Sequence, residues 1–179
     1  MIPILNLTRQ YEQLKTRIDE ALIRVAASGH YILGPEVSAF EAEMAKYLGV
    51  KHVIGCANGT DALFLALRAL KIGAGDEVIT TPFSYMATSE SIVRAGARPV
   101  FVDIEPDTMN MDVSLLEAAI TPNTKAILPV HIFGQAAIMD EIRRVAQSHN
   151  LYIVEDCAQA IGSDYKGQKV GGLGDIGCF

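Results

Sequence analysis

A short polar turn at residues 56–61 has the residue types of a phosphate-binding site. It follows an expected strand and opens an apolar helix. Gly59 would let a ligand approach the backbone, Thr60 adds a hydroxyl donor, and the first N–H groups of a helix carry partial positive charge. The same residues are also typical of ordinary helix capping, with Asn58, Thr60 or Asp61 as the cap. Taken alone, this pattern favours capping over phosphate binding.

Two successive carboxylates, Glu155 and Asp156, close the apolar run Leu151–Val154. Successive side chains of a strand point in opposite directions, so only one of the two can face a given pocket. An aspartate at a strand end could pair with a protonated ring nitrogen, the partner that the pyridine of pyridoxal phosphate needs as an electron sink. The alternative, favoured for an isolated carboxylate, is that Asp156 caps the following turn.

Three ring-bearing side chains also follow expected strands. Phe83 and Tyr85 come after the run Glu77–Thr80 and could stack on a flat cofactor, or they could belong to the core. His131 is more often a structural histidine than a catalytic one. These weak signals share a location, because each residue follows a strand. The carboxyl ends of the strands are where the ligands of parallel sheets gather.

A glycine-rich segment, Gly172–Gly177, matches the glycine spacing of dinucleotide-binding proteins. That spacing indicates a nucleotide site only between a strand and a helix, with an acidic residue about 20 positions further on. Here it follows the polar turn Tyr165–Lys169, so we interpret it as a glycine-rich loop.

The elements that must bring these residues together form an alternating pattern. Short apolar runs alternate with helical stretches, which predicts an α/β fold of three layers, with a mostly parallel sheet between helices. The runs are apolar almost throughout, as is typical of strands covered on both faces. The expected strands are Val53–Cys56, Glu77–Thr80, Pro99–Asp103, Ala126–Val130, Leu151–Glu155 and Ile176–Phe179. The expected helices are Leu14–Val25 (stopped by Gly29), Pro35–Gly49, Thr60–Leu70, Ser84–Ala95, Ser114–Ile120 and Met139–His149.

Composition excludes several classes of function. The chain has 179 residues, half of them hydrophobic, and a formal net charge of −6. No basic cluster is longer than Arg143-Arg144, so we expect no nucleic-acid partner. The longest uncharged stretch, Ala126–Met139, is shorter than the about 20 apolar residues of a membrane-spanning helix, and no signal-peptide pattern is present. The three cysteines, at positions 56, 157 and 178, fit neither a disulfide framework nor a zinc site. We expect a cytoplasmic protein without a metal or a membrane partner.

Five segments together carry a family resemblance. They are Tyr31–Val37, Asn58–Leu63, Gly75–Thr80, Val154–Gln159 and Gly174–Phe179. In this order and spacing, over essentially the whole chain, they resemble the nucleotide-sugar aminotransferases of the DegT–StrS type. The resemblance implies the large domain of a fold-type I enzyme dependent on pyridoxal 5′-phosphate, here incomplete at its C-terminal side. It implies transfer of an amino group, typically from glutamate, to a nucleotide-linked keto sugar, as in polysaccharide biosynthesis.

The resemblance also gives the polar turn a role. Thr60 and the neighbouring backbone of Gly59 and Asp61 would hold the cofactor phosphate. This favours the functional interpretation of the turn over capping alone.

Three further residues would contact the cofactor ring. The resemblance implies that Tyr85 stacks on the pyridine, that Asp156 pairs with the ring nitrogen, and that Gln159 lies near the ring hydroxyl. The strand-end carboxylate is thereby favoured as a functional residue.

The family requires one further residue, the lysine to which the cofactor is attached. The family attaches its cofactor to a lysine in a segment that begins with Ser-Phe just after a Gly-Cys-Phe motif, so the Schiff-base lysine is expected beyond Phe179. Lys166 and Lys169 lie in the preceding loop and do not match the motif. We therefore expect no catalytic residue within the chain and no transamination by these 179 residues alone.

The resemblance predicts the domain organisation as well. Residues 1–179 would form part of the cofactor-binding large domain, with a helical N-terminal segment at about residues 1–49 and without the small C-terminal domain. At full length, the resemblance implies a homodimer.

Three other functions stay open. The first is a dehydratase of the same family, with histidine in place of the lysine. The second is a non-catalytic, truncated homologue that binds a sugar nucleotide. The third, a nicotinamide-dependent oxidoreductase, ranks last because only the glycine spacing supports it.

Overall fold

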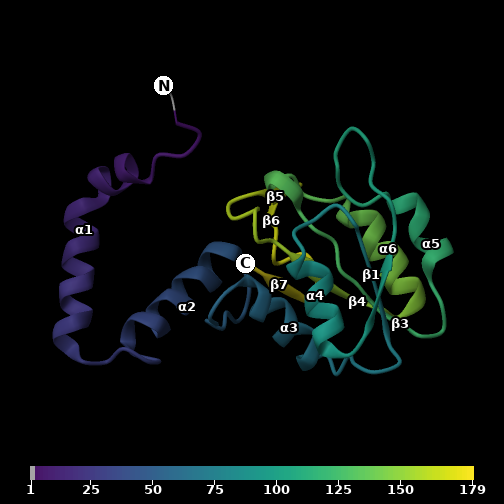
Figure 1. The fold of residues 1–179 in the computed structure, drawn as a ribbon, viewed down its shortest axis with the longest axis horizontal. Coiled ribbons are helices and arrows are strands. Elements are labelled where there is room, and N and C mark those ends of the chain that lie inside the picture. Colours follow the sequence, from purple (N-terminus) through teal and green to yellow (C-terminus); the bar gives the residue numbers. More distant parts are fainter. Residues whose placement is uncertain (1–2) are drawn as a thin grey trace. The chain divides into compact units, whose positions relative to one another are not determined.

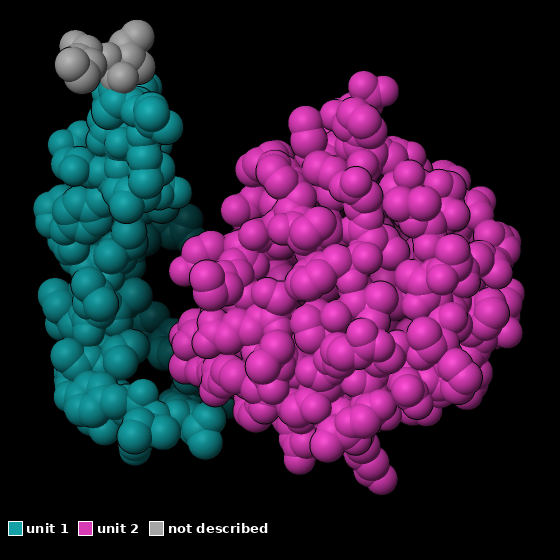
Figure 2. Space-filling view, turned by 45° about the vertical axis from the view of Figure 1, so that its right-hand side comes forward, with its two compact units in different colours: residues 1–44 teal, residues 45–179 magenta. Residues whose placement is uncertain are grey.

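The structure is a computed structural model, and it describes residues 3–179. The chain divides into two compact units, Met1–Met44 and Ala45–Phe179 (Figure 2). Within the described residues, no helix combines the length and the apolar character needed to cross a membrane.

The N-terminal unit contains helix α1 (Leu7–Ser28) and most of helix α2 (Pro35–Leu48). The side chain of Asn6 caps α1 by accepting a hydrogen bond from the Arg9 N–H at 3.0 Å. Gly29 ends the helix in the left-handed conformation, with φ of 67°, which a glycine adopts without steric cost. The stop predicted at this glycine is confirmed.

A five-stranded sheet with the order β2-β1-β3-β4-β7 forms the centre of the second unit (Figure 1). Every neighbouring pair in this sheet is parallel, as the alternating pattern predicts. Its strands are β1 (Glu77–Thr80), β2 (Arg98–Phe101), β3 (Thr124–Ile127), β4 (Tyr152–Asp156) and β7 (Ile176–Cys178). The helices of this unit are α3 (Gly59–Ala69), α4 (Ala87–Ala95), α5 (Leu116–Ala119) and α6 (Met139–His149), with short 3-10 turns η1 (Val113–Leu115) and η2 (Ile132–Gly134).

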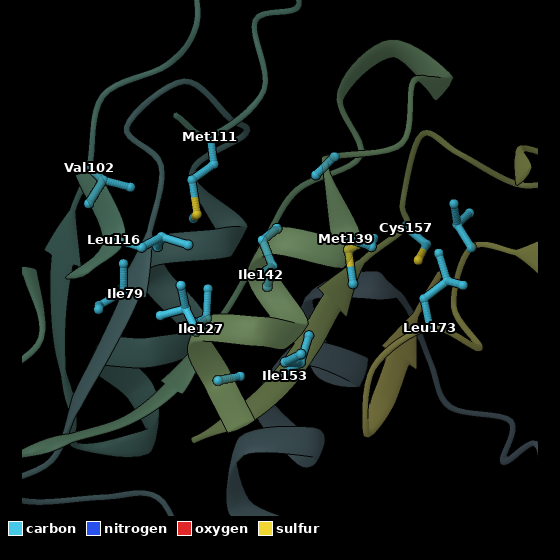
Figure 3. Packing of buried hydrophobic residues seen from close by; sticks show 14 of the residues in the cluster. Ile79, Val102, Met111, Leu116, Ile127, Met139, Ile142, Ile153, Cys157 and Leu173 are labelled. Carbon is cyan, nitrogen blue, oxygen red and sulfur yellow. The ribbon is translucent and has the colours of Figure 1, made fainter. Parts of the chain in front are cut away.

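Each face of the sheet packs against its own pair of helices, which confirms the three layers. Ile79, Ile127 and Ile153 point into one apolar cluster, which includes Met139 and Ile142 of α6 (Figure 3). Val78, Leu128 and Val154, each next in the chain to one of these isoleucines, enter a second cluster with α3 and α4. This alternation follows from the two-residue period of a strand, and burial on both faces explains why the central strands are largely apolar.

The strand predicted at Val53–Cys56 is wrong. No strand among the described residues pairs with this segment, and Ile54 is 84% exposed. An apolar run becomes a strand only when a neighbour accepts its hydrogen bonds, and no local pattern reports that neighbour. The turn at residues 56–61 therefore follows a segment without regular secondary structure rather than a strand.

The loop between β4 and β7 carries a small hairpin. Strands β5 (Asp164–Tyr165) and β6 (Gln168–Lys169) pair antiparallel around Lys166 and Gly167, both of which have positive φ. Two positive φ angles in a two-residue loop match the twist of the flanking strands.

Candidate functional site

The polar residues singled out above converge at the carboxyl edge of the sheet. Because all five strands are parallel, the segments after β1, β3 and β4 emerge at the same edge. His131 lies beside the end of β4, since its N–H donates to the Asp156 carbonyl at 3.0 Å. The start of α3 also reaches this edge, because a Cβ placed on Gly59 would lie 4.0 Å from the Ala158 Cβ.

The start of α3 combines a cap with open donors. Asn58 Oδ1 accepts a hydrogen bond from the Asp61 N–H at 2.9 Å, so the capping interpretation of the turn is correct for Asn58. Within residues 3–179, the N–H groups of Gly59 and Thr60 and the Thr60 hydroxyl have no hydrogen-bond partner. Asp61 would have to share its N–H between Asn58 and a ligand. Capping and anion binding are therefore compatible at this helix end.

Removing this cap is expected to destabilise the unit moderately. Asn58→Ala leaves the Asp61 N–H without its acceptor, which should lower the free energy of unfolding by about 1 kcal/mol. Asn58→Ser keeps a hydroxyl acceptor at the cap and serves as the control. Urea denaturation followed by circular dichroism measures both, and an equal loss in the two variants would contradict the role of the cap.

Asp156 is almost buried, at 6% exposure, and its two oxygens have different partners. Oδ2 accepts a hydrogen bond from the Thr88 hydroxyl at 2.8 Å, and Oδ1 accepts one from the Ala158 N–H at 3.2 Å. The contact with Ala158 is the cap of the following turn that the sequence favoured for an isolated carboxylate. The carboxylate retains unused lone pairs, so it can still accept a hydrogen bond from a bound cation.

Tyr85 and Gln159 lie on segments that meet this edge. Tyr85 follows β1 and is 79% exposed, so its ring is available to a flat ligand. Gln159 Oε1 accepts a hydrogen bond from the Phe133 N–H at 3.2 Å, which ties the segment after β4 to the loop after β3. Phe83 packs edge-to-face against Phe133, with 6.1 Å between ring centroids.

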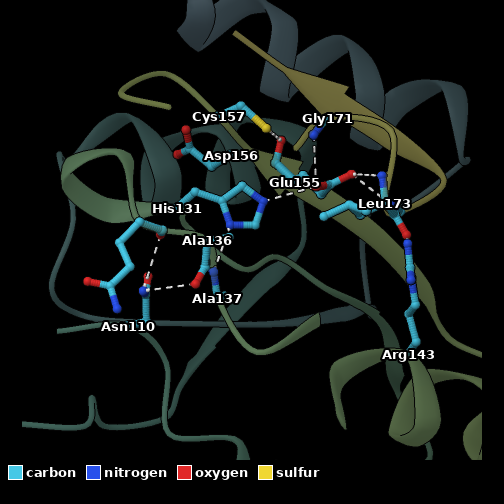
Figure 4. A network of polar contacts seen from close by, with 12 residues as sticks. Asn110, His131, Ala136, Ala137, Arg143, Glu155, Asp156, Cys157, Gly171 and Leu173 are labelled. Carbon is cyan, nitrogen blue, oxygen red and sulfur yellow. Dashed lines mark hydrogen bonds and ion pairs between the residues drawn. The ribbon is translucent and has the colours of Figure 1, made fainter. Parts of the chain in front are cut away.

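Glu155 points to the side of β4 opposite to Asp156 and is fully buried (Figure 4). Its Oε1 accepts hydrogen bonds from the N–H groups of Leu173 at 2.8 Å and Gly174 at 2.6 Å. Its Oε2 accepts from the Gly171 N–H at 2.9 Å and pairs with His131 Nε2 at 2.9 Å. Burial acts to raise the pKa of this carboxyl, but the bonds from His131, Gly171 and Gly174 outweigh it and hold the pKa below its ordinary value.

His131 is a structural residue, as the sequence suggested. Its Nδ1 accepts a hydrogen bond from the Ala137 N–H at 3.0 Å, so the ring proton lies on Nε2 and is donated to Glu155. Both ring nitrogens of this fully buried side chain are therefore occupied.

His131, Glu155 and Cys157 bring potential metal ligands within 4.8 Å of one another. The hydrogen bonds described above already use both imidazole nitrogens and both carboxylate oxygens. Burial raises the pKa of the Cys157 thiol far above its ordinary value, which keeps it in the protonated form that binds metals poorly. We interpret this cluster as a hydrogen-bonded part of the core.

The glycine-rich segment is a loop followed by β7, and its glycines serve close packing. A Cβ on Gly177 would lie 2.3 Å from the Gly171 Cα, and one on Gly174 would lie 2.8 Å from the Ile153 carbonyl oxygen. These approaches let the loop present its N–H groups to Glu155. The interpretation of this segment as a loop rather than a nucleotide-binding turn is confirmed for residues 172–175.

A cavity of about 650 Å³ opens at the other, amino-terminal edge of the sheet. Thr124 at the start of β3 and Tyr152 at the start of β4 contribute to its lining. None of the candidate site residues lines this cavity, so it takes no part in the site described here.

Sequence reasoning missed one contributor to the candidate site and the structural role of a second residue. Thr88, which contacts Asp156, was expected only as part of a helix. Glu155, which holds the glycine-rich loop, was expected only as the neighbour of Asp156. The opposite directions of successive strand residues did separate the two carboxylates, but nothing in the local pattern pointed to the partners of either.

The sequence of this chain is similar to those of known aminotransferases. Residues 12–179 match the DegT/DnrJ/EryC1/StrS aminotransferase family. The chain is 53% identical over 178 residues to the pleiotropic regulatory protein of Geobacillus stearothermophilus, covering 99% of this chain and 48% of that protein. It is 48% identical over 178 residues to the UDP-2-acetamido-2-deoxy-3-oxo-D-glucuronate aminotransferase of Pseudomonas aeruginosa, covering 99% and 50%. The chain thus spans about half the length of the curated relatives it matches.

Solved structures match the fold closely. The crystal structure of S. venezuelae DesV in complex with a ketimine intermediate superimposes with a TM-score of 0.94 at 48% identity, over 95% of this chain and 46% of that one. The structure of NtdA from Bacillus subtilis with bound cofactor PMP gives a TM-score of 0.88 at 37% identity, over 93% and 38%.

Proposed function

Because this chain belongs to the DegT/DnrJ/EryC1/StrS aminotransferase family, we propose that it forms the cofactor-binding part of a nucleotide-sugar aminotransferase. The observation that carries the proposal is the location of Asp156. Its carboxylate lies at the carboxyl end of β4, and the open donors of α3 reach the same edge. An acceptor for a cationic ring and donors for a phosphate are thus available together.

The residues at this edge fit pyridoxal 5′-phosphate, whose amino form is PMP. The free N–H groups of Gly59 and Thr60 and the Thr60 hydroxyl suit a phosphate, because a helix N-terminus favours an anion. Asp156 can only accept hydrogen bonds when ionised, as a protonated ring nitrogen requires. When bound, the cofactor supplies an electron sink for proton transfers at the amino-bearing carbon.

Each of the six candidate residues has its own task in binding the cofactor. Thr60, with the backbone of Gly59 and Asp61, binds the phosphate. Tyr85, exposed beside β1, stacks on the ring. Asp156 holds the proton on the ring nitrogen, and Gln159 lies near the ring hydroxyl, where its amide is oriented by Phe133.

The proposal places the Schiff-base lysine outside residues 1–179. Lys166 forms an ion pair with Asp140, and Lys169 donates to the Gly162 carbonyl at 2.8 Å. Both lysines of the hairpin are therefore engaged away from the candidate site. In the same proposal, residues 1–179 are part of a large domain, the whole protein is a cytoplasmic homodimer, and glutamate is the amino donor.

The function is tested with the protein that contains this chain. It is loaded with cofactor, supplied with glutamate carrying a heavy nitrogen isotope, and offered a panel of UDP- and dTDP-linked keto sugars. We expect the label to appear in an amino sugar nucleotide, detected by mass spectrometry.

The same assay separates the alternatives. A sugar product that has lost a hydroxyl group and carries no label would indicate a dehydratase. Oxidation or reduction of a nicotinamide cofactor added to the same mixture would indicate an oxidoreductase. Binding of the sugar nucleotide without turnover would indicate a non-catalytic homologue. Each of these results would overturn the proposed amino transfer.

A further inference from the structure

Helix α4 contains three hydroxyl-bearing residues, and only one of their side chains contacts Asp156. Ser89 Oγ donates to the Met86 carbonyl at 3.1 Å, and Ser91 Oγ donates to the Thr88 carbonyl at 2.9 Å. Both acceptors lie three positions earlier in the chain, so these bonds are local, as is usual for such residues. Thr88, in contrast, directs its hydroxyl to Asp156 Oδ2 at 2.8 Å, although the two residues are 68 positions apart in the sequence.

The direction of the hydrogen bonds around Thr88 follows from its single hydroxyl proton. An ionised carboxylate only accepts, so the Thr88 proton points to Asp156. Ser84 Oγ lies 2.7 Å from Thr88 Oγ1 and must then be the donor of that second bond. The result is an ordered chain of donors that runs from Ser84 through Thr88 to Asp156.

Burial protects the hydrogen bonds of this chain of donors from competition by water. Thr88 is 2% exposed, so water has little access to compete for its bonds. With Oδ2 held by Thr88 and Oδ1 held by the Ala158 N–H, the carboxylate is fixed in one orientation from both sides. A buried hydrogen bond to a charged group contributes more than one between neutral groups.

We propose that Thr88, itself oriented by Ser84, is a positioning residue that fixes the Asp156 carboxylate for contact with the ring nitrogen of the cofactor. This inference rests on the proposed function. Thr88 acts through Asp156 and need not touch the cofactor itself.

The test compares two cofactors in the whole protein after its own cofactor has been removed. One is PMP, and the other is the analogue in which the ring nitrogen is replaced by C–H. The analogue has no proton to share with Asp156, so the ratio of the two dissociation constants isolates the contact with the ring nitrogen. Fluorescence titration measures binding without requiring turnover.

Thr88→Val keeps the shape of the side chain and removes the hydroxyl. It is expected to weaken PMP binding by about tenfold or more and to change binding of the analogue by less than about threefold. Thr88→Ser should restore the wild-type ratio. Ser91→Ala, which removes a buried hydroxyl bonded only within α4, should leave the ratio unchanged.

Two outcomes separate this inference from the proposed function. If wild type prefers PMP over the analogue and Thr88→Val keeps that preference, the positioning role is wrong while the function stands. If wild type binds both equally, the contact between Asp156 and the ring nitrogen is absent, and the inference fails together with the task that the proposed function assigns to Asp156. Should Thr88→Val not fold, Ser84→Ala replaces it, with an expected loss of about threefold in the ratio, and an unchanged ratio would overturn the inference.

Discussion

Replacing Asp156 with asparagine is expected to slow amino transfer on the order of 100- to 1000-fold. An amide cannot hold the proton on the ring nitrogen by charge. The structure adds a second reason, because both carboxylate oxygens accept hydrogen bonds, from Thr88 and from Ala158. An asparagine would turn an N–H group toward one of these donors and lose its fixed orientation.

The measurement is the rate of the half-reaction from PMP and a nucleotide-linked keto sugar, followed by the absorbance of the cofactor. Asp140→Asn is the matched control, since Asp140 pairs with Lys166 on the surface of α6. The control should keep its rate within about twofold, because exposed ion pairs contribute little. Equal rates in the two variants would exclude Asp156 from the reaction.

Replacing Glu155 with glutamine is expected to lower the free energy of unfolding by about 3 kcal/mol. The buried carboxylate satisfies four donors, those of His131, Gly171, Leu173 and Gly174. The amide NH₂ of glutamine would face two of them and leave both without an acceptor. The glycine-rich loop would then be held to β4 by fewer hydrogen bonds, among them those between Asp175 and Ile153.

Urea denaturation measures this loss, with Glu117→Gln as the control. Glu117 is exposed and pairs with Arg144 at 3.3 Å, so its replacement should cost less than about 0.5 kcal/mol. A similarly small effect at Glu155 would show that the loop does not depend on the carboxylate.

The pKa of Glu155 also predicts how the free energy of unfolding depends on pH. The pKa of Glu155 is lower in the folded chain than its ordinary value of 4.5, so the folded state favours the ionised form. Its contribution to stability is complete above that ordinary value and is lost as the pH falls through the folded-state pKa. The stability gap between wild type and Glu155→Gln should therefore be constant near neutral pH and narrow in acid. A gap that widens in acid would contradict this assignment.

Much of the fold could be predicted because it depends on local patterns. Apolar runs separated by helical stretches require helices on both faces of a parallel sheet, and Val78 and Ile79 enter opposite clusters as that arrangement demands. Gly29 ended a helix because only its own backbone conformation was needed. The run Val53–Cys56 failed as a strand because strand formation needs a neighbouring chain segment, which its own composition does not report.

The candidate site likewise combines features that follow from local sequence with features that follow from the tertiary structure. The sequence by itself determined that a capped, glycine-containing helix start and a pair of strand-end carboxylates exist, and that the two carboxylates face opposite sides. Only the tertiary structure decided their partners: Thr88 and Ala158 for Asp156, and His131 with the glycine-rich loop for Glu155. The physical reason is that capping and side-chain alternation act over a few residues. Most of these partners, in contrast, lie far away in the sequence, and contacts of a few ångströms between them depend on the register set by packing on both faces of the sheet.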